Sequence, residues 1–321
     1  MSKLRLAISI VLVLTALLFV LGQVGTPLWY TDLFSHFQLQ YLIVFSLCFI
    51  ALYALRDNAY SLLALFFALA SLSLITPYLS GAKYLSADTS DLSSTLEGVP
   101  VRILFHNMWI ANTSYPKITN LINSEDPDIL ILAEVAGKTY KELVEKLSDE
   151  YPYHAFAGAK SYLDVAYFSK LQPLDAEVVY SKGDERAPTL RLSYNIEGKE
   201  LVIYGVHTSA PLNREKSLAR DNHLADLGAR LALEEKQVVL VGDLNLSPWS
   251  PRYRSFTDLS GLVDLRVGRG LLASWSQYLP VITRIPIDHA LATPALTIAG
   301  LRLGDPAGSD HAPIVLDVIL D

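Results

Sequence analysis

The chain has 321 residues, of which 51% are hydrophobic, and it carries a mean hydropathy of +0.30 and a formal net charge of −7. This hydropathy excludes an ordinary soluble enzyme, because the apolar excess is concentrated in the first 80 residues. The single cysteine, Cys48, excludes an intramolecular disulfide and a multi-thiolate metal site. Any bound metal must therefore be held by oxygen or imidazole ligands.

Residues 1–80 predict a membrane region of three transmembrane helices, over 4–22, 39–55 and 59–80. Each stretch has about the 17–25 residues that a bilayer core requires. A cleaved signal peptide is the alternative for the first stretch, which follows a short basic start. The stretch is longer than the usual apolar core of a signal peptide, and no clear cleavage site follows it. A retained helix is therefore favoured.

The basic residues near these stretches predict how the chain crosses the membrane. Lys3 and Arg5 precede the first stretch, and Arg56 lies between the second and third. Because cytoplasmic loops carry the excess of basic residues, both places are expected in the cytoplasm. The prediction is a multi-pass protein of the cell (inner) membrane with an extracytoplasmic carboxyl-terminal domain, although Lys83 opposes this bias.

Residues 81–100 are rich in Ser, Thr, Asp and Gly, which predicts a polar linker. Residues 101–321 then suffice for one sizeable domain of two packed sheets with helices. Only two of the 33 acidic residues, but four of the 26 basic ones, precede Tyr84. The domain is therefore acidic, which disfavours a general nucleic-acid binder, although a local basic groove can lie on an acidic domain.

Hydrophobic periodicity within the domain predicts alternating strands and helices. Strands are expected over 101–109, 126–135, 164–170, 188–196, 200–208 and 238–245, and near 285–292 and 311–318. Helices are expected over 115–123, 139–149, 213–235 and 251–259. Several of these strands are apolar runs that end in polar side chains.

The polar strand ends form the candidate site. Asp243 and Asn245, at positions i and i+2 of an extended chain, project to the same face. Taken alone they are also ordinary turn formers. Ionisable groups at the ends of core strands cost free energy unless they are paired or bind an ion, so their repeated occurrence predicts one polar site at a sheet edge. The residues are Asn107, Glu134, His207, Asp243, Asn245, Asp288, Asp310 and His311.

The order of these residues, with the motifs G-D-x-N at 242–245, I-D-H at 287–289 and S-D-H at 309–311, resembles the endonuclease/exonuclease/phosphatase (DNase I-like) superfamily. The resemblance spans about residues 101–320. The stretch DLNLSPWSPRYRSF, at 243–256, is most similar to bacterial members with amino-terminal membrane helices. The resemblance implies an α+β fold, a four-layer α/β/β/α sandwich with the site between the two sheets.

The resemblance also implies a divalent cation, Mg²⁺ with Mn²⁺ as the alternative. Glu134 would be the principal ligand, with Asp310 and Asn107 nearby. Carboxylate and amide oxygens suit a hard cation that keeps several waters.

The same resemblance implies the catalytic roles. Asp243 would activate or align the attacking water, and Asn245 would hold that water or a phosphate oxygen. His311, paired with Asp288, and His207 would stabilise the developing charge. An Asp-paired His is held in one tautomer, and its cationic form is favoured.

These roles predict a metal-dependent hydrolase of phosphate esters, with nuclease-like phosphodiester hydrolysis as the first interpretation. A phospholipid or small-molecule phosphoesterase is the alternative, and a non-catalytic binding protein of this fold is the third hypothesis. Loops set specificity in this fold, so the sequence fixes neither the substrate nor the oligomeric state. The nearby Trp109, Trp249 and Trp275 are expected to pack at loop bases, with lining of a substrate cleft as the alternative. Arg186 and Arg191 are expected to be exposed strand charges, with a phosphate contact as the alternative.

Overall fold

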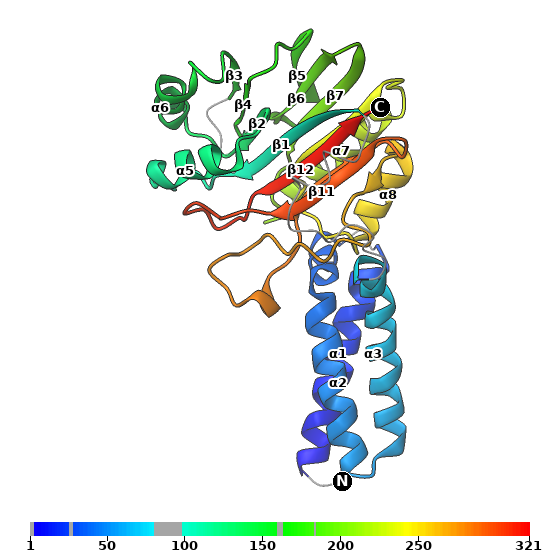
Figure 1. The fold of residues 1–321 in the computed structure, drawn as a ribbon. Helices are drawn as coiled ribbons and strands as arrows, with labels where there is room; N and C mark the ends of the chain where they lie inside the picture. The colour runs from blue at the N-terminus through cyan, green and yellow to red at the C-terminus, as the bar shows by residue number, and fades with distance from the viewer. Residues whose placement is uncertain (1–2, 26–27, 80–97, 159–162, 183) are drawn as a thin grey trace.

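The computed structural model describes residues 3–25, 28–79, 98–158, 163–182 and 184–321. Figure 1 shows a bundle of three long helices below a domain built on two β-sheets. Residues 81–97 of the predicted polar linker, 81–100, lie outside the described residues.

The bundle consists of α1 (Lys3–Gln23), α2 (Gln38–Ala54) and α3 (Asn58–Leu79). These bounds agree within one residue with the three stretches predicted from hydropathy, and each helix is long and apolar enough to span a membrane. A 3₁₀ helix, η1 (Trp29–Phe37), joins α1 to α2 and was not predicted.

The domain contains two six-stranded sheets, which confirms the predicted α+β sandwich. The first sheet has the order β11-β12-β1-β2-β4-β3, with bounds Thr297–Leu303, Ile314–Leu320, Val99–Asn107, Ile129–Ala133, Val165–Ser169 and Tyr153–Ala157. The second has the order β5-β6-β7-β8-β10-β9, with bounds Asp175–Ser181, Asp184–Ile196, Lys199–His207, Gln237–Asp243, Asp288–Ala292 and Val263–Asp264. Both sheets mix parallel and antiparallel pairs.

Apolar side chains from both sheets form the central core, among them Ile103, Ile131, Leu192 and Ile203. Alternation along each strand sends the other side chains outward, where helices cover them. The outer face of the first sheet packs under α5 (Tyr115–Glu125) and α6 (Gly137–Leu147), and that of the second under α7 (Arg214–Leu231) and α8 (Pro251–Ser260). The result is four layers.

Strand register brings the polar strand ends to one edge of the sandwich. In the parallel pair β7 and β8, His207 lies opposite Asp243, and in the antiparallel pair β8 and β10, Asp243 lies opposite Asp288. In the other sheet, Asn107 ends β1 opposite Ala133 of β2, so Glu134 follows directly. The two sheets therefore present their polar ends side by side.

The bundle packs directly against the domain. Arg220 of α7 forms an ion pair with Asp32 of η1, 2.9 Å long, and neither side chain is exposed. Trp249 donates its indole N–H to the carbonyl of Leu74 in α3 at 2.9 Å, and the Gly268 N–H donates to the Pro77 carbonyl at 2.9 Å. The membrane-type helices are thus joined to the domain by tertiary contacts.

Candidate active site

Four strand-end residues from the two sheets contact one another. The Asn107 amide Nδ2 donates to Glu134 Oε1 at 3.0 Å and to Asp243 Oδ2 at 3.1 Å. His207 Nε2 lies 3.7 Å from Glu134 Oε1 and 3.8 Å from Asp243 Oδ2. One amide and one imidazole therefore bridge the two carboxylates across the gap between the sheets.

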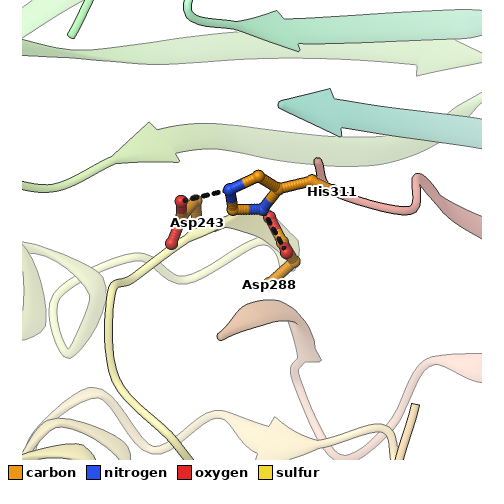
Figure 2. Close-up of side chains that lie close together, drawn as sticks. All are labelled: Asp243, Asp288 and His311. Atoms are coloured by element: carbon orange, nitrogen blue, oxygen red, sulfur yellow. Dashed lines mark hydrogen bonds and ion pairs between the residues drawn. The ribbon is translucent and has the colours of Figure 1, made fainter. Parts of the chain in front are cut away.

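The same Asp243 oxygen, Oδ2, also lies near a histidine that is paired with a second carboxylate. His311 Nδ1 is hydrogen-bonded to Asp288 Oδ2 at 2.8 Å, and its Nε2 lies 3.9 Å from Asp243 Oδ2 (Figure 2). The Asp288 contact fixes the ring orientation, so that Nε2 is the nitrogen presented to Asp243. All three side chains are buried.

Burial and charge set the pKa values of this group. Burial, aided by the negative charge of Asp288, raises the pKa of Asp243 from 3.8 to about 8. Burial alone would lower the pKa of His311, but Asp288 outweighs it through charge and hydrogen bonding, and raises the value to about 10. Burial lowers the pKa of His207, with Glu134 opposing the shift. At neutral pH the site holds one cationic and one neutral histidine.

Asn245 occupies a turn that is tied in three places. Its backbone is left-handed, with φ of 51°, its N–H donates to Asp243 Oδ1 at 2.8 Å, and its side-chain Nδ2 donates to the Thr208 carbonyl at 2.9 Å. Arg220 donates to the Asn245 carbonyl at 3.1 Å. A positive φ at a non-glycine residue costs about 1–3 kcal/mol, so these contacts hold a conformation that Asn245 would not favour alone.

Asp310 lies at the same edge, next to His311. Its Oδ2 accepts a hydrogen bond from Trp275 Nε1 at 2.8 Å, and its Oδ1 lies 4.0 Å from His311 Nε2. Oδ1 is buried and has no hydrogen-bond partner among the described residues. The structure thus brings all eight predicted site residues to one edge, as a continuous set of contacts.

The sequence matches the model of the endonuclease/exonuclease/phosphatase family over residues 104–311, which include every one of these residues. The chain belongs to this family. Members of the family are generally hydrolases of phosphate esters. No curated protein sequence matches the chain.

Solved structures of this family share the fold. An endonuclease/exonuclease/phosphatase from Beutenbergia cavernae is 20% identical with a TM-score of 0.56, covering 69% of this chain and 72% of its own. D. rerio TDP2, complexed with a single-strand DNA product, is 16% identical with a TM-score of 0.59, covering 68% and 98%. Sphingomyelinase C from Streptomyces griseocarneus is 15% identical with a TM-score of 0.51, covering 68% and 99%.

Members of the family typically use divalent metal ions, and the donor set fits a hard cation in two places. Asp243, Asp288 and His311 place one ligand atom each within 4.8 Å of one another. Metal ligation needs a deprotonated imidazole, whereas Asp288 holds His311 in its cationic form, so this group is the weaker candidate. The carboxylates of Glu134 and Asp310 and the side-chain oxygen of Asn107 are the other candidate donors, and the buried Asp310 Oδ1 has no hydrogen-bond partner among the described residues.

The site opens into a pocket of about 480 Å³, a volume typical of small-molecule sites. Trp109 and Trp275 line it, which favours the alternative of a cleft over packing at loop bases, whereas Trp249 packs against α3. Arg186 and Arg191 do not line it and pair with acidic residues elsewhere. Arg186 is exposed as expected, whereas Arg191 is largely buried by its pairing with Glu234, contrary to the expectation.

Sequence reasoning missed one wall of the pocket. Trp29, Leu33, His36 and Phe37 of η1 line it opposite the catalytic edge. The only signal was an aromatic segment with one acid, Asp32, between two apolar stretches, and no structure was predicted for it.

The raised pKa values predict how stability depends on pH without metal. A group whose pKa is higher in the folded state stabilises the fold at low pH and loses that contribution as pH rises through the folded value. The pKa values of Asp243 and His311 are both raised in the folded state, so we expect the unfolding free energy in EDTA to fall between pH 7 and 9.5. Asp243 should account for about 1 kcal/mol of this fall.

The measurement is thermal unfolding of the full-length protein in detergent at several pH values. The variant Asp243→Asn has no titrating group at this position and should show a shallower dependence. Equal slopes in the two proteins would show that Asp243 titrates as an ordinary carboxyl group.

Proposed function

We propose that this protein is a membrane-anchored, divalent-metal-dependent phosphodiesterase. The observation that carries the proposal is the contact of Asp243 with His311, itself hydrogen-bonded to Asp288, beside the carboxylate of Glu134. The raised pKa makes the Asp243 carboxylate a stronger base, which is suited to accept a proton from water. The neighbouring cationic imidazole of His311 is suited to supply a proton to the leaving group.

In the reaction, Asp243 takes a proton from water as the water oxygen bonds to phosphorus. The bond from phosphorus to the leaving alcohol oxygen breaks, and His311 donates its Nε2 proton to that oxygen. Asp288 keeps the His311 ring in place during this transfer. Asn245 orients the water or a phosphate oxygen, and His207 donates a hydrogen bond to another phosphate oxygen.

Glu134 would be the principal ligand of the cation, with Asp310 and the Asn107 side-chain oxygen as further ligands. A bound Mg²⁺ or Mn²⁺ would neutralise phosphate oxygens as charge develops on them. Asn107 presently directs its nitrogen to the carboxylates and its Oδ1 to the Trp109 N–H at 3.0 Å. Rotation of the amide by half a turn would present oxygen instead.

Two substrate classes fit this chemistry. Nuclease-like hydrolysis is one, and a member of the fold is known in complex with a DNA product. Lipid phosphoester hydrolysis is the other, and a sphingomyelinase also has this fold. We further propose that α1, α2 and α3 span the cell membrane and place the domain on its extracytoplasmic side, from the positions of Lys3, Arg5 and Arg56.

The proposal predicts metal-dependent hydrolysis of bis(p-nitrophenyl) phosphate by the full-length protein in detergent, lost in EDTA. Loss of a metal's outer-shell partner commonly costs about 10–100-fold in metal affinity, so Glu134→Gln should raise the Mg²⁺ requirement at least tenfold. Isothermal titration with Mg²⁺ checks this independently of turnover.

Glu145→Gln, an exposed site on α6, is the matched control and should behave as the parent protein. Activity that persists in EDTA would refute metal dependence, and an unchanged Mg²⁺ affinity in Glu134→Gln would remove this residue from the metal site.

A further inference from the structure

The pocket has two chemically different halves. One half carries the phosphate-directed groups, among them Glu134, His207, Asp243 and His311. The other half is apolar and includes Trp29, Leu33, Phe37, Leu212, Ile285 and Ile287. A substrate that fills both halves must join a phosphate to an apolar group of comparable size.

Three of these six apolar residues lie where the bundle meets the domain. Trp29, Leu33 and Phe37 belong to η1, which continues directly into α2. Ser250 donates to Asp32 at 2.5 Å and Arg220 pairs with the same carboxylate, so η1 is held against the domain by buried contacts. This wall is therefore a fixed part of the active site.

The segment that leads to Ile285, one of the residues lining the pocket, also contacts the end of the bundle. Gln40, in the first turn of α2, donates to the Ile282 carbonyl at 2.8 Å. The segment around it exposes Tyr278, Val281 and Ile282, at 64%, 68% and 59% of their surface. Clustered exposed apolar side chains mark an interaction surface, and here they continue from a bundle apolar enough to cross a bilayer.

The charge of the lining residues discriminates between the two substrate classes. Neither lysine nor arginine occurs among the pocket-lining residues that the structure describes. Nucleic acids are held largely by basic side chains that neutralise successive phosphates. A single phosphate attached to an apolar body needs no such series.

From these observations we infer that the substrate is a phospholipid of the membrane in which the protein sits, with its phosphate at Asp243 and His311 and its apolar part against η1 and Leu212. This inference rests on the proposed phosphodiesterase function. Water adds to phosphorus, one P–O ester bond breaks, and the products are a phosphate monoester and an alcohol, one of them carrying the acyl chains.

The test uses full-length protein with Mg²⁺ and three probes: vesicles of phosphatidylethanolamine and phosphatidylglycerol, bis(p-nitrophenyl) phosphate, and plasmid DNA. The readout is the ratio of kcat/KM for the lipid to kcat/KM for the soluble diester. Loss of an apolar contact of leucine size should lower this ratio about tenfold in Leu212→Gln. Leu212 is 70% exposed, so the substitution leaves the fold intact.

Leu233→Gln is the matched control, because Leu233 is 83% exposed and does not line the pocket, and its ratio should be unchanged. Lipid turnover with a lowered ratio in Leu212→Gln alone supports the inference. Hydrolysis of the diester or nicking of DNA without lipid turnover overturns the inference and leaves the proposed function standing. No metal-dependent hydrolysis of any probe overturns both.

Discussion

Replacing Asp243 by Asn is expected to lower kcat for bis(p-nitrophenyl) phosphate by about 10³-fold, within the range of about 10²–10⁴ typical for loss of a general base. The amide has nearly the shape of the carboxyl group and keeps an acceptor for the Asn245 N–H. It has no carboxylate to take a proton from water. The Asn107 amide loses the acceptor that Asp243 Oδ2 provides at 3.1 Å, so a loss of about 1–3 kcal/mol in stability should accompany the kinetic effect.

Steady-state kinetics and thermal unfolding of the same preparation separate these two effects. Asp258→Asn, at an exposed site on α8, is the matched control and should retain full activity. Retention of a tenth or more of the parent kcat in Asp243→Asn would remove Asp243 as the base and would direct attention to Glu134 or His207.

The second large effect is expected at the buried ion pair between the bundle and the domain. Arg220→Met leaves the Asp32 carboxylate with no exposed surface and without its closest cation. Removing one partner of a buried pair typically costs about 3–5 kcal/mol, because the other charge stays desolvated. Arg220 also donates to the Asn245 carbonyl, so the active-site turn should loosen and kcat should fall as well.

A double-mutant cycle separates the pair from the rest of the site. Asp32→Leu with Arg220→Met removes both charges and should recover most of the lost stability, measured by thermal unfolding in detergent. Arg230→Met, exposed on the same helix, is the control. A loss below about 1 kcal/mol in Arg220→Met would show that Asp32 finds other partners, Ser250 and Arg252 being the nearest.

Much of the fold and of the candidate site could be predicted because its signals are local. The three long apolar stretches gave α1, α2 and α3 within one residue, since a span is defined by length and composition alone. Asp243 and Asn245 were identified from strand periodicity. The remaining polar strand ends were identified because each follows an apolar run of the same kind. Peripheral strands such as β3, β5 and β11 were not assigned, because they carry weaker apolar patterns.

The pairing of polar groups could not be predicted from local signals. Which carboxylate meets His311, and which amide bridges Glu134 to Asp243, depends on strand register and on how one sheet lies over the other. The pKa values of about 8 for Asp243 and about 10 for His311 follow from the burial of these groups and from their pairing. Local sequence signals specify neither the burial nor the pairing.

The sequence by itself determined the membrane-type helices and the set of polar residues at the strand ends, because each follows from periodicity or composition over a few residues. Its motifs implied the two-sheet class through their resemblance to a known family. Only the tertiary structure decided that η1 closes one side of the active site. That wall depends on contacts such as Asp32 with Arg220, 188 residues apart, and on the burial of both side chains. A short polar and aromatic connection carries no local sign of a partner so distant along the chain, because the stabilising contact exists only after both parts have folded.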